Sequence, residues 1–401
     1  MSVGVANTDF EVVGGVRLAA MACGIKKNGK HDLVLIEFAE GSVAAGVFTK
    51  SLFAAAPVQV GRRHITAPSM RYFLINSGNA NAGVGDAGIE DSMACCRALS
   101  AQAHVAVDAV IPFSTGVIGE RLPVAKITDA LPTLMAALDP THWLVAARGI
   151  MTTDTRPKIA SRQVEIGGST VTITGIAKGA GMIQPNMATM LCYMATDARC
   201  SREQLQEMLA GAVGHSFNRI TVDSDTSTND SCMLVATGAS GVDVSSGKAR
   251  DAFESMLGSL ALELAQGIIR DGEGATKFVA VVVKNGPTSQ VCCDIAYSIA
   301  NSPLMKTALF ASDANWGRIV MAIGKAPVSI DVNRLDVYLG DVQLMAAGQK
   351  RPDYTEAAGA AVMAREEITI TVDLNAGDVT ETVWTSDLSH EYVTINAEYR
   401  T

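Results

Sequence analysis

The sequence of 401 residues is 48% hydrophobic and 18% charged, which is typical of a globular protein with a large core. A net charge of −9 argues against the basic surface with which proteins bind nucleic acid or anionic membranes. No apolar run reaches the roughly eighteen residues that a membrane-spanning helix needs. The length predicts two or three domains.

The N-terminal residues and the cysteines indicate the compartment. The first ten residues lack a basic end followed by an apolar block, so no secretion signal is expected. The cysteines form no Cys-x-x-Cys pair and lie within apolar runs, which favours buried reduced thiols over disulfides or a zinc site. We therefore expect a cytoplasmic protein. The cysteines are at positions 23, 95, 96, 192, 200, 232, 292 and 293.

The first half of the chain is predicted to begin as a meander of antiparallel strands, because turn residues recur at intervals of about ten residues. The strands expected in this half lie at residues 10–13, 32–38, 43–49, 72–76, 105–113 and 171–174. The helices expected in this half lie at residues 90–103, 124–138 and 141–149.

Two glycine-containing segments of this half could bind a ligand. Residues 83–88 have the glycine spacing of a dinucleotide-binding loop, but an asparagine-rich stretch separates them from their strand, so a turn is predicted. Thr115 and Gly116 end a strand, where a hydroxyl and a backbone N–H can point into a pocket as an oxyanion hole does. A simple turn is the alternative interpretation.

The second half is predicted to contain longer helices and a second group of strands. Ser201 is the expected N-cap of a helix that ends near residue 213. Residues 217–231 are dense in hydroxyls and carboxylates, but their spacing is not that of a calcium loop. Glu273, between two glycines, is compatible with a solvated turn. Further helices are expected at 249–270, 295–309 and 352–365, and strands at 278–284, 328–333, 336–340, 366–374 and 379–385.

The segment 178–191, KGAGMIQPNMATML, is the most distinctive in the chain. It begins as a glycine-rich turn, and Pro185 excludes a helix through it. Thr189 follows Ala188, so the preceding carbonyl group is sterically open to attack by the threonine hydroxyl. A tight turn that enters a buried strand at 190–194 is the alternative interpretation.

This segment resembles the self-cleavage site of the ornithine acetyltransferases, also called glutamate N-acetyltransferases, of the arginine pathway. The resemblance extends over nearly the whole chain, including residues 24–27, 76–81 and 152–155 and the C-terminal tail. The predicted helices and strands themselves indicate an α/β or α+β fold, and the resemblance implies in addition a layered α-β-β-α sandwich similar to the N-terminal-nucleophile hydrolases. A smaller C-terminal α/β lobe, at about residues 280–390, is also implied.

The same resemblance implies that the chain cuts itself between Ala188 and Thr189. The products would be an alpha chain of residues 1–188 and a beta chain of residues 189–401, assembled as an α2β2 tetramer. Thr189 is then the nucleophile and Thr115 and Gly116 form the oxyanion hole. The matching substrate-binding positions are Thr152, Lys178, Thr189, Glu273, Asn396 and Thr401.

An N-terminal threonine carries both a nucleophile and a base, since a free α-amine has a pKa of about 7.7–8.0 and accepts the hydroxyl proton. The resemblance implies transfer of the acetyl group from N-acetylornithine to glutamate through an acetyl-enzyme. No metal or cofactor is implied, although some members also use acetyl-CoA to acetylate glutamate. A self-processing threonine aminopeptidase or amidase and a non-enzymatic metabolite-binding protein are the alternatives.

Overall fold

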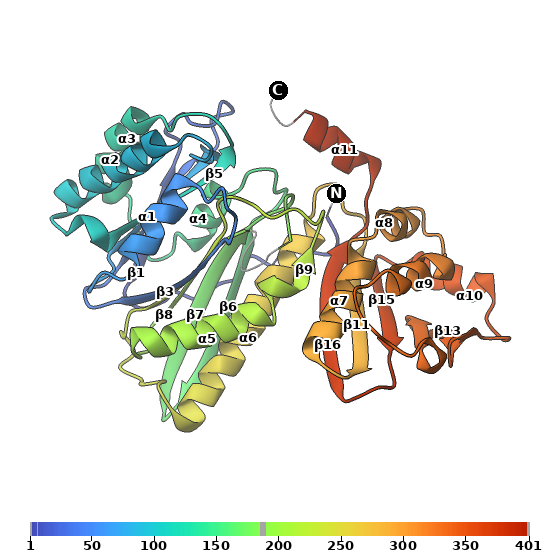
Figure 1. Ribbon diagram of the computed structural model, residues 1–401. Helices are drawn as coiled ribbons and strands as arrows, with labels where there is room; N and C mark the ends of the chain where they lie inside the picture. The colour runs from blue at the N-terminus through green and yellow to red at the C-terminus, as the bar shows by residue number, and fades with distance from the viewer. Residues whose placement is uncertain (1, 6, 185–189, 399–401) are drawn as a thin grey trace.

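The computed structural model describes residues 2–5, 7–184 and 190–398. Figure 1 shows a layered body, coloured blue to yellow, beside a smaller orange and red lobe. In the described parts of the chain, no helix is long and apolar enough to cross a membrane. All eight cysteines are free thiols, and six of them are buried.

Two sheets form the centre of the layered body. The first has the order β1-β2-β4-β5, in which only the β4–β5 pair is parallel. The second has the order β3-β10-β8-β7-β6, in which only the β10–β8 pair is parallel. Their strands are β1 (Val16–Met21), β2 (Leu33–Phe38), β3 (Val43–Phe48), β4 (Tyr72–Asn79), β5 (Val110–Val117), β6 (Lys158–Ile166), β7 (Ser169–Lys178), β8 (Leu191–Thr196) and β10 (Ser231–Ala236).

Apolar side chains from both sheets fill the space between them. Phe73 of β4 packs against Phe38, Phe113 and Tyr193, with ring centroids 4.8, 5.1 and 5.9 Å away. Tyr193 belongs to β8, so this aromatic cluster joins the two sheets. Fully buried rings of this size contribute much of the hydrophobic free energy that holds such layers together.

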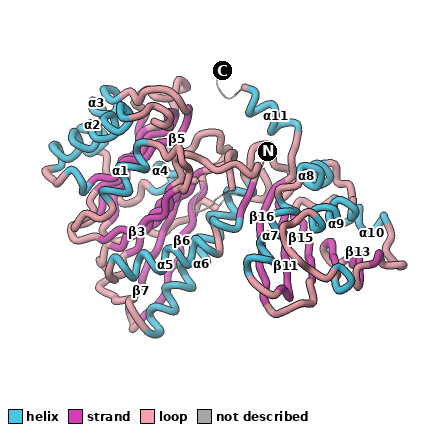
Figure 2. Tube along the Cα trace, in the orientation of Figure 1, coloured by secondary structure: helices cyan, strands magenta, loops and turns pink. Residues whose placement is uncertain are grey.

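Helices cover the outer face of each sheet. On the first sheet, α2 and α3 bury a separate core, and on the second sheet α5 and α6 do the same. The α-β-β-α sandwich expected from the resemblance is therefore confirmed (Figure 2). The helices of the body are α1 (Ala56–His64), α2 (Asp86–Ala103), α3 (Val124–Ala136), α4 (Trp143–Gly149), α5 (Arg202–Gly214) and α6 (Gly247–Arg270), with short 3-10 turns at Val107–Ala109 and Phe217–Arg219.

The smaller lobe is built on a third sheet, in the order β14-β13-β12-β15-β11-β16-β9. Helices α7, α9 and α10 pack against it around one apolar core. Its strands are β9 (Ile220–Thr221), β11 (Phe278–Gly286), β12 (Asp336–Leu339), β13 (Val342–Ala346), β14 (Gln349–Lys350), β15 (Glu367–Asp373) and β16 (Val379–Ser386). The helices are α7 (Ser289–Ala300), α8 (Pro303–Phe310), α9 (Trp316–Gly324), α10 (Glu356–Met363) and the C-terminal α11 (His390–Ala397).

Several local predictions are confirmed and several are wrong. Ser201 caps α5 in a full capping box, with its side chain accepting from the N–H of Gln204. Residues 10–13 form no strand, and β3 leaves the expected meander to pair with β10. The helix expected at 295–309 is two helices, because Pro303 starts α8 and Ser302 caps it. A 3-10 turn, Val332–Arg334, replaces the strand expected at 328–333.

Candidate active site

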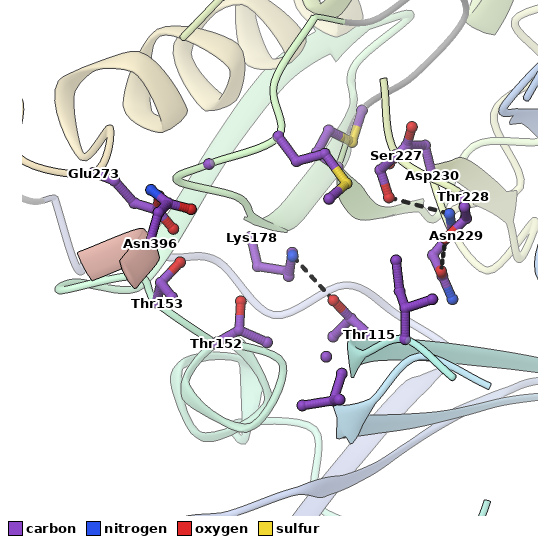
Figure 3. A pocket seen from close by; sticks show the side chains of 16 residues that line it. Thr115, Thr152, Thr153, Lys178, Ser227, Thr228, Asn229, Asp230, Glu273 and Asn396 are labelled. Atoms are coloured by element: carbon purple, nitrogen blue, oxygen red, sulfur yellow. Dashed lines mark hydrogen bonds between the residues drawn. The ribbon is translucent and has the colours of Figure 1, made fainter. Parts of the chain in front are cut away.

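A cavity of about 270 Å³ lies where the ends of β5, β7, β8 and β10 meet the loops around them. Ten of its sixteen lining residues have polar side chains, and they come from parts of the sequence far apart from one another (Figure 3). The lining residues are Thr115, Gly116, Val117, Ile118, Thr152, Thr153, Lys178, Gly181, Met182, Met190, Ser227, Thr228, Asn229, Asp230, Glu273 and Asn396.

Thr115 and Lys178 form a direct polar pair in this cavity. The Lys178 Nζ donates a hydrogen bond to Thr115 Oγ1 at 3.0 Å. Burial lowers the pKa of Lys178, while the charge of Asp154 acts in the opposite direction. Gly116, the next residue of β5, has a φ of +135°, and a Cβ there would collide with the backbone of Gly78 on β4. Only glycine fits this close approach of two strands.

Three buried charged side chains form a cluster near Lys178. Lys158 is 3% exposed and forms ion pairs with Asp154 and with Asp271, the latter at 2.6 Å. Asp154 accepts from the N–H of Gly179 at 2.8 Å and from the N–H of Thr152 at 2.9 Å. The ionised aspartate therefore fixes the backbone on two sides of the cavity at once.

Glu273 and Asn396 meet at another side of the cavity. The Asn396 Nδ2 donates to Glu273 Oε2 at 2.7 Å, and the N–H of Glu273 donates to the carbonyl of Ala180 at 2.9 Å. The Glu273 carboxylate lies directly against the Cα of Gly181, where any Cβ would overlap with it. Glu273 is 8% exposed, so it is not the solvated turn residue that its glycine neighbours suggested.

The substitution Gly181→Ala is expected to displace the Glu273 carboxylate and lower the free energy of unfolding by about 1–3 kcal/mol, the usual effect of overpacking. Gly258→Ala is the matched control, because a Cβ at this position of α6 meets no atom within 4 Å. The control should stabilise by about 0.5–1 kcal/mol. Denaturant unfolding of both variants measures the difference, and equal effects would contradict the close contact.

The segment before the Ala188–Thr189 step is held by the loop that precedes β10. Asp223 accepts from the N–H groups of Met182 and Ile183 at 2.6 and 2.8 Å. The N–H of Gln184 donates to the carbonyl of Asp225 at 2.9 Å, and its side chain accepts from Asn301 Nδ2 at 2.6 Å. These hydrogen bonds therefore fix residues 182–184.

The structure brings most of the expected site residues together. Six of them line the cavity, namely Thr115, Gly116, Thr152, Lys178, Glu273 and Asn396. Ala188, Thr189 and Thr401 lie outside the described residues, although Met190, which follows Thr189, lines the cavity. Thr153 also lines it, so both threonines of the 152–153 pair face this space.

Sequence reasoning missed the four lining residues of the 227–230 stretch. These four residues belong to the polar run at 217–231, and the sequence pattern of that run was compared only with a calcium-binding loop. In the part of the chain that the structure describes, no three His, Cys, Asp or Glu side chains are grouped closely enough to hold a metal ion. A polar run that ends directly before a fully buried strand, as 227–230 does before β10, is the feature that could have identified it.

Comparisons with known proteins agree over the length of the chain. The model of the ArgJ family matches residues 17–401. Arginine biosynthesis bifunctional protein ArgJ of Pseudomonas syringae pv. tomato is 52% identical over 393 residues, 97% of each chain. The protein of the same description from Psychrobacter arcticus is 52% identical over 390 residues, 96% of each chain.

A solved structure is also similar. The crystal structure of arginine biosynthesis bifunctional protein ArgJ from Bacillus halodurans is 34% identical, with a TM-score of 0.50. The match covers 52% of this chain and 98% of that chain. Taken together with the full-length sequence matches, these similarities show that the chain belongs to the ArgJ family.

Proposed function

We propose that this protein is a bifunctional acetyltransferase of arginine biosynthesis. It moves the acetyl group of N2-acetylornithine to glutamate through an acetyl ester on Thr189, and it also acetylates glutamate from acetyl-CoA. The observation that carries the proposal is the composition of the cavity. Gly181 and Met182, before the Ala188–Thr189 step, and Met190, after it, line the same space as Lys178 and Thr115.

The first reaction is the cut of the chain. The Oγ of Thr189 attacks the carbonyl carbon of Ala188, the C–N bond breaks, and the nitrogen takes up a proton to become the new α-amine. Water then hydrolyses the ester and regenerates the hydroxyl. Negative charge develops on the carbonyl oxygen, and the hydroxyl of Thr115 with the N–H of Gly116 are the donors we assign to it.

Acetyl transfer repeats this chemistry with the freed amine as base. The amine of Thr189 takes the proton of its own hydroxyl, the Oγ bonds to the acetyl carbon, and ornithine leaves with that proton. The amine of glutamate then attacks the acetyl carbon, the bond between that carbon and Oγ breaks, Oγ recovers a proton given up by the attacking amine, and N-acetylglutamate leaves. The bond broken and the bond formed are both amides of an α-amino acid, so no external energy source is needed.

The polar lining suits amino acids of this kind. Lys178 and Thr152 fit a substrate α-carboxylate, with Asp154 fixing the backbone of Thr152. Glu273 fits an ammonium group, either that of the substrate or that of the new N-terminus, and Asn396 orients it. Thr401 belongs to the same proposed set.

The proposed chains are residues 1–188 and 189–401, with the smaller lobe at about 280–390 and an α2β2 assembly in the cytoplasm. The Bacillus halodurans chain supports such a cut, because it is matched over 98% of its length yet spans only 52% of this chain. It is thus about half as long, as a chain that begins at Thr189 would be.

Three measurements on the unmodified protein test the proposal. Intact mass should show fragments 1–188 and 189–401, and N-terminal sequencing of the second fragment should begin Thr-Met-Leu. Incubation with N-acetylornithine should release ornithine at a sustained rate only when glutamate is present. Sustained release without glutamate would favour an amidase, and one uncut chain without activity would favour a metabolite-binding protein.

The substitution Thr115→Ala is expected to reduce kcat by about 100- to 1000-fold, the usual cost of one oxyanion donor, with a much smaller effect on stability. Thr174→Ala is the matched control, since it also removes a buried hydroxyl from a strand but does not line the cavity. Steady-state kinetics and thermal unfolding measure both effects. Parallel losses of stability and rate in Thr115→Ala would assign the hydroxyl a structural role.

A further inference from the structure

Asp230 is a buried carboxyl group of the cavity that the proposed reaction leaves without a role. It is 2% exposed, directly precedes β10 and lines the cavity. Its Oδ2 has no hydrogen-bond partner among the described residues. Figure 3 shows Asp230 and Glu273 on opposite sides of Lys178.

The backbone around Asp230 is held in place on both sides. The carbonyl of Asp230 accepts from the N–H of Thr49 at 3.0 Å, and the N–H of Ser231 donates to the carbonyl of Met190 at 2.9 Å. The Asn229 Nδ2 donates to the carbonyls of Ala80 and Ser114 at 2.6 and 2.9 Å. The backbone that carries the Asp230 carboxyl group is therefore held in a fixed position beside the cavity.

The electrostatic surroundings of Asp230 favour a cationic donor. Burial raises the pKa of its carboxyl group well above the usual value, although hydrogen bonds from Ser227 and the charge of Lys178 act in the opposite direction. Lys178 donates its hydrogen bond to Thr115. A cationic N–H group that enters the cavity would lower this raised pKa and so keep the carboxyl group ionised, and it would supply the hydrogen-bond donor that Oδ2 lacks.

We infer that the unpartnered Oδ2 of Asp230 binds an ammonium group inside this cavity. The inference rests on the proposed function, which supplies two sources of such a group. One is the side-chain ammonium of N-acetylornithine, and the other is the α-amine that the cut leaves on Thr189. In both cases the carboxylate accepts a charge-assisted hydrogen bond, the stronger kind of hydrogen bond in proteins.

The variant Asp230→Asn, which keeps the shape but removes the charge, distinguishes the two sources. The probes are N-acetylornithine and N-acetylnorvaline, which has the same carbon chain without the ammonium. If Asp230 binds the substrate, the preference of kcat/KM for N-acetylornithine should fall at least about tenfold in the variant, because a charge-assisted hydrogen bond to the ammonium is lost.

If Asp230 binds the α-amine instead, the preference should stay unchanged and the pH dependence should shift. A carboxylate raises the pKa of a neighbouring amine, and the amine acts as a base only when neutral. Activity therefore rises with pH, and removing the carboxylate should move this rise to lower pH by about one unit.

Asp197→Asn is the matched control, because Asp197 is 9% exposed, has a raised pKa through burial and lies outside the cavity. It should behave as the unmodified protein, and Asp230→Glu should restore part of the effect. If Asp230→Asn does not fold, Asp230→Ser gives the same comparison with a smaller uncharged side chain.

An unchanged preference together with an unchanged pH profile would overturn the inference. A folded Asp230→Asn chain that stays uncut would also overturn it and assign the residue to chain cutting. Failure of the unmodified protein to transfer acetyl from N-acetylornithine would instead reject the proposed function, so the two failures are distinguishable.

Discussion

Thr189→Ala is expected to yield a chain of unchanged length that transfers no acetyl group. Without the hydroxyl, neither the attack on Ala188 nor the acetyl ester can form, and without the cut there is no free amine to act as base. The loss of kcat/KM should be on the order of 10⁴-fold or more, as for other groups that act as one catalytic unit. Intact mass and acetyl transfer measured on the same preparation give both results.

Thr189→Ser is the informative control for this substitution. Serine keeps the hydroxyl and, after cutting, an α-amine, so the chain should be cut more slowly and should retain some activity. An alanine variant still cut between positions 188 and 189 would show that another group performs the cleavage.

Lys158→Met should lower the free energy of unfolding by about 3–5 kcal/mol, because it leaves two buried carboxylates without their cation. Asp154 and Asp271 would then face each other in a nearly water-free environment. Denaturant unfolding should show a lower midpoint. Lys325→Met, at an exposed position, should change the free energy of unfolding by less than about 0.5 kcal/mol, and equal effects in both variants would contradict the assignment.

The same cluster should contribute to acid sensitivity. Burial alone would raise the pKa of Asp154, but Lys158 and Lys178 hold it below its usual range. A carboxyl group whose pKa is lower in the folded state stabilises the protein above the unfolded value of about 3.9. This contribution is lost as the pH falls below that value towards the folded pKa. The free energy of unfolding of the unmodified protein, measured between pH 5 and about 2, should therefore fall as the pH falls.

The features that were predicted correctly from the sequence are those that depend on residues close together in the chain. The capping box at Ser201 and the strand at 171–174 depend on neighbouring residues, and both are present. The strand that pairs with β3 could not be predicted, because the pattern of apolar side chains along β3 would be the same in either sheet. The cluster of Lys158, Asp154 and Asp271 could not be predicted either, because Lys158 and Asp271 are 113 positions apart in the sequence. The site residues were identified by resemblance, which does not depend on contacts in space.

The order of strands in the second sheet has a consequence for the two chains that the proposed cleavage would produce. β8 and β10 follow the Ala188–Thr189 step, yet they lie between β3 on one side and β7 with β6 on the other, all three of which precede it. Each proposed product would therefore supply strands that the other requires as neighbours. Backbone cleavage would leave two interleaved polypeptides that cannot dissociate without unfolding, and neither should form a stable protein when produced alone.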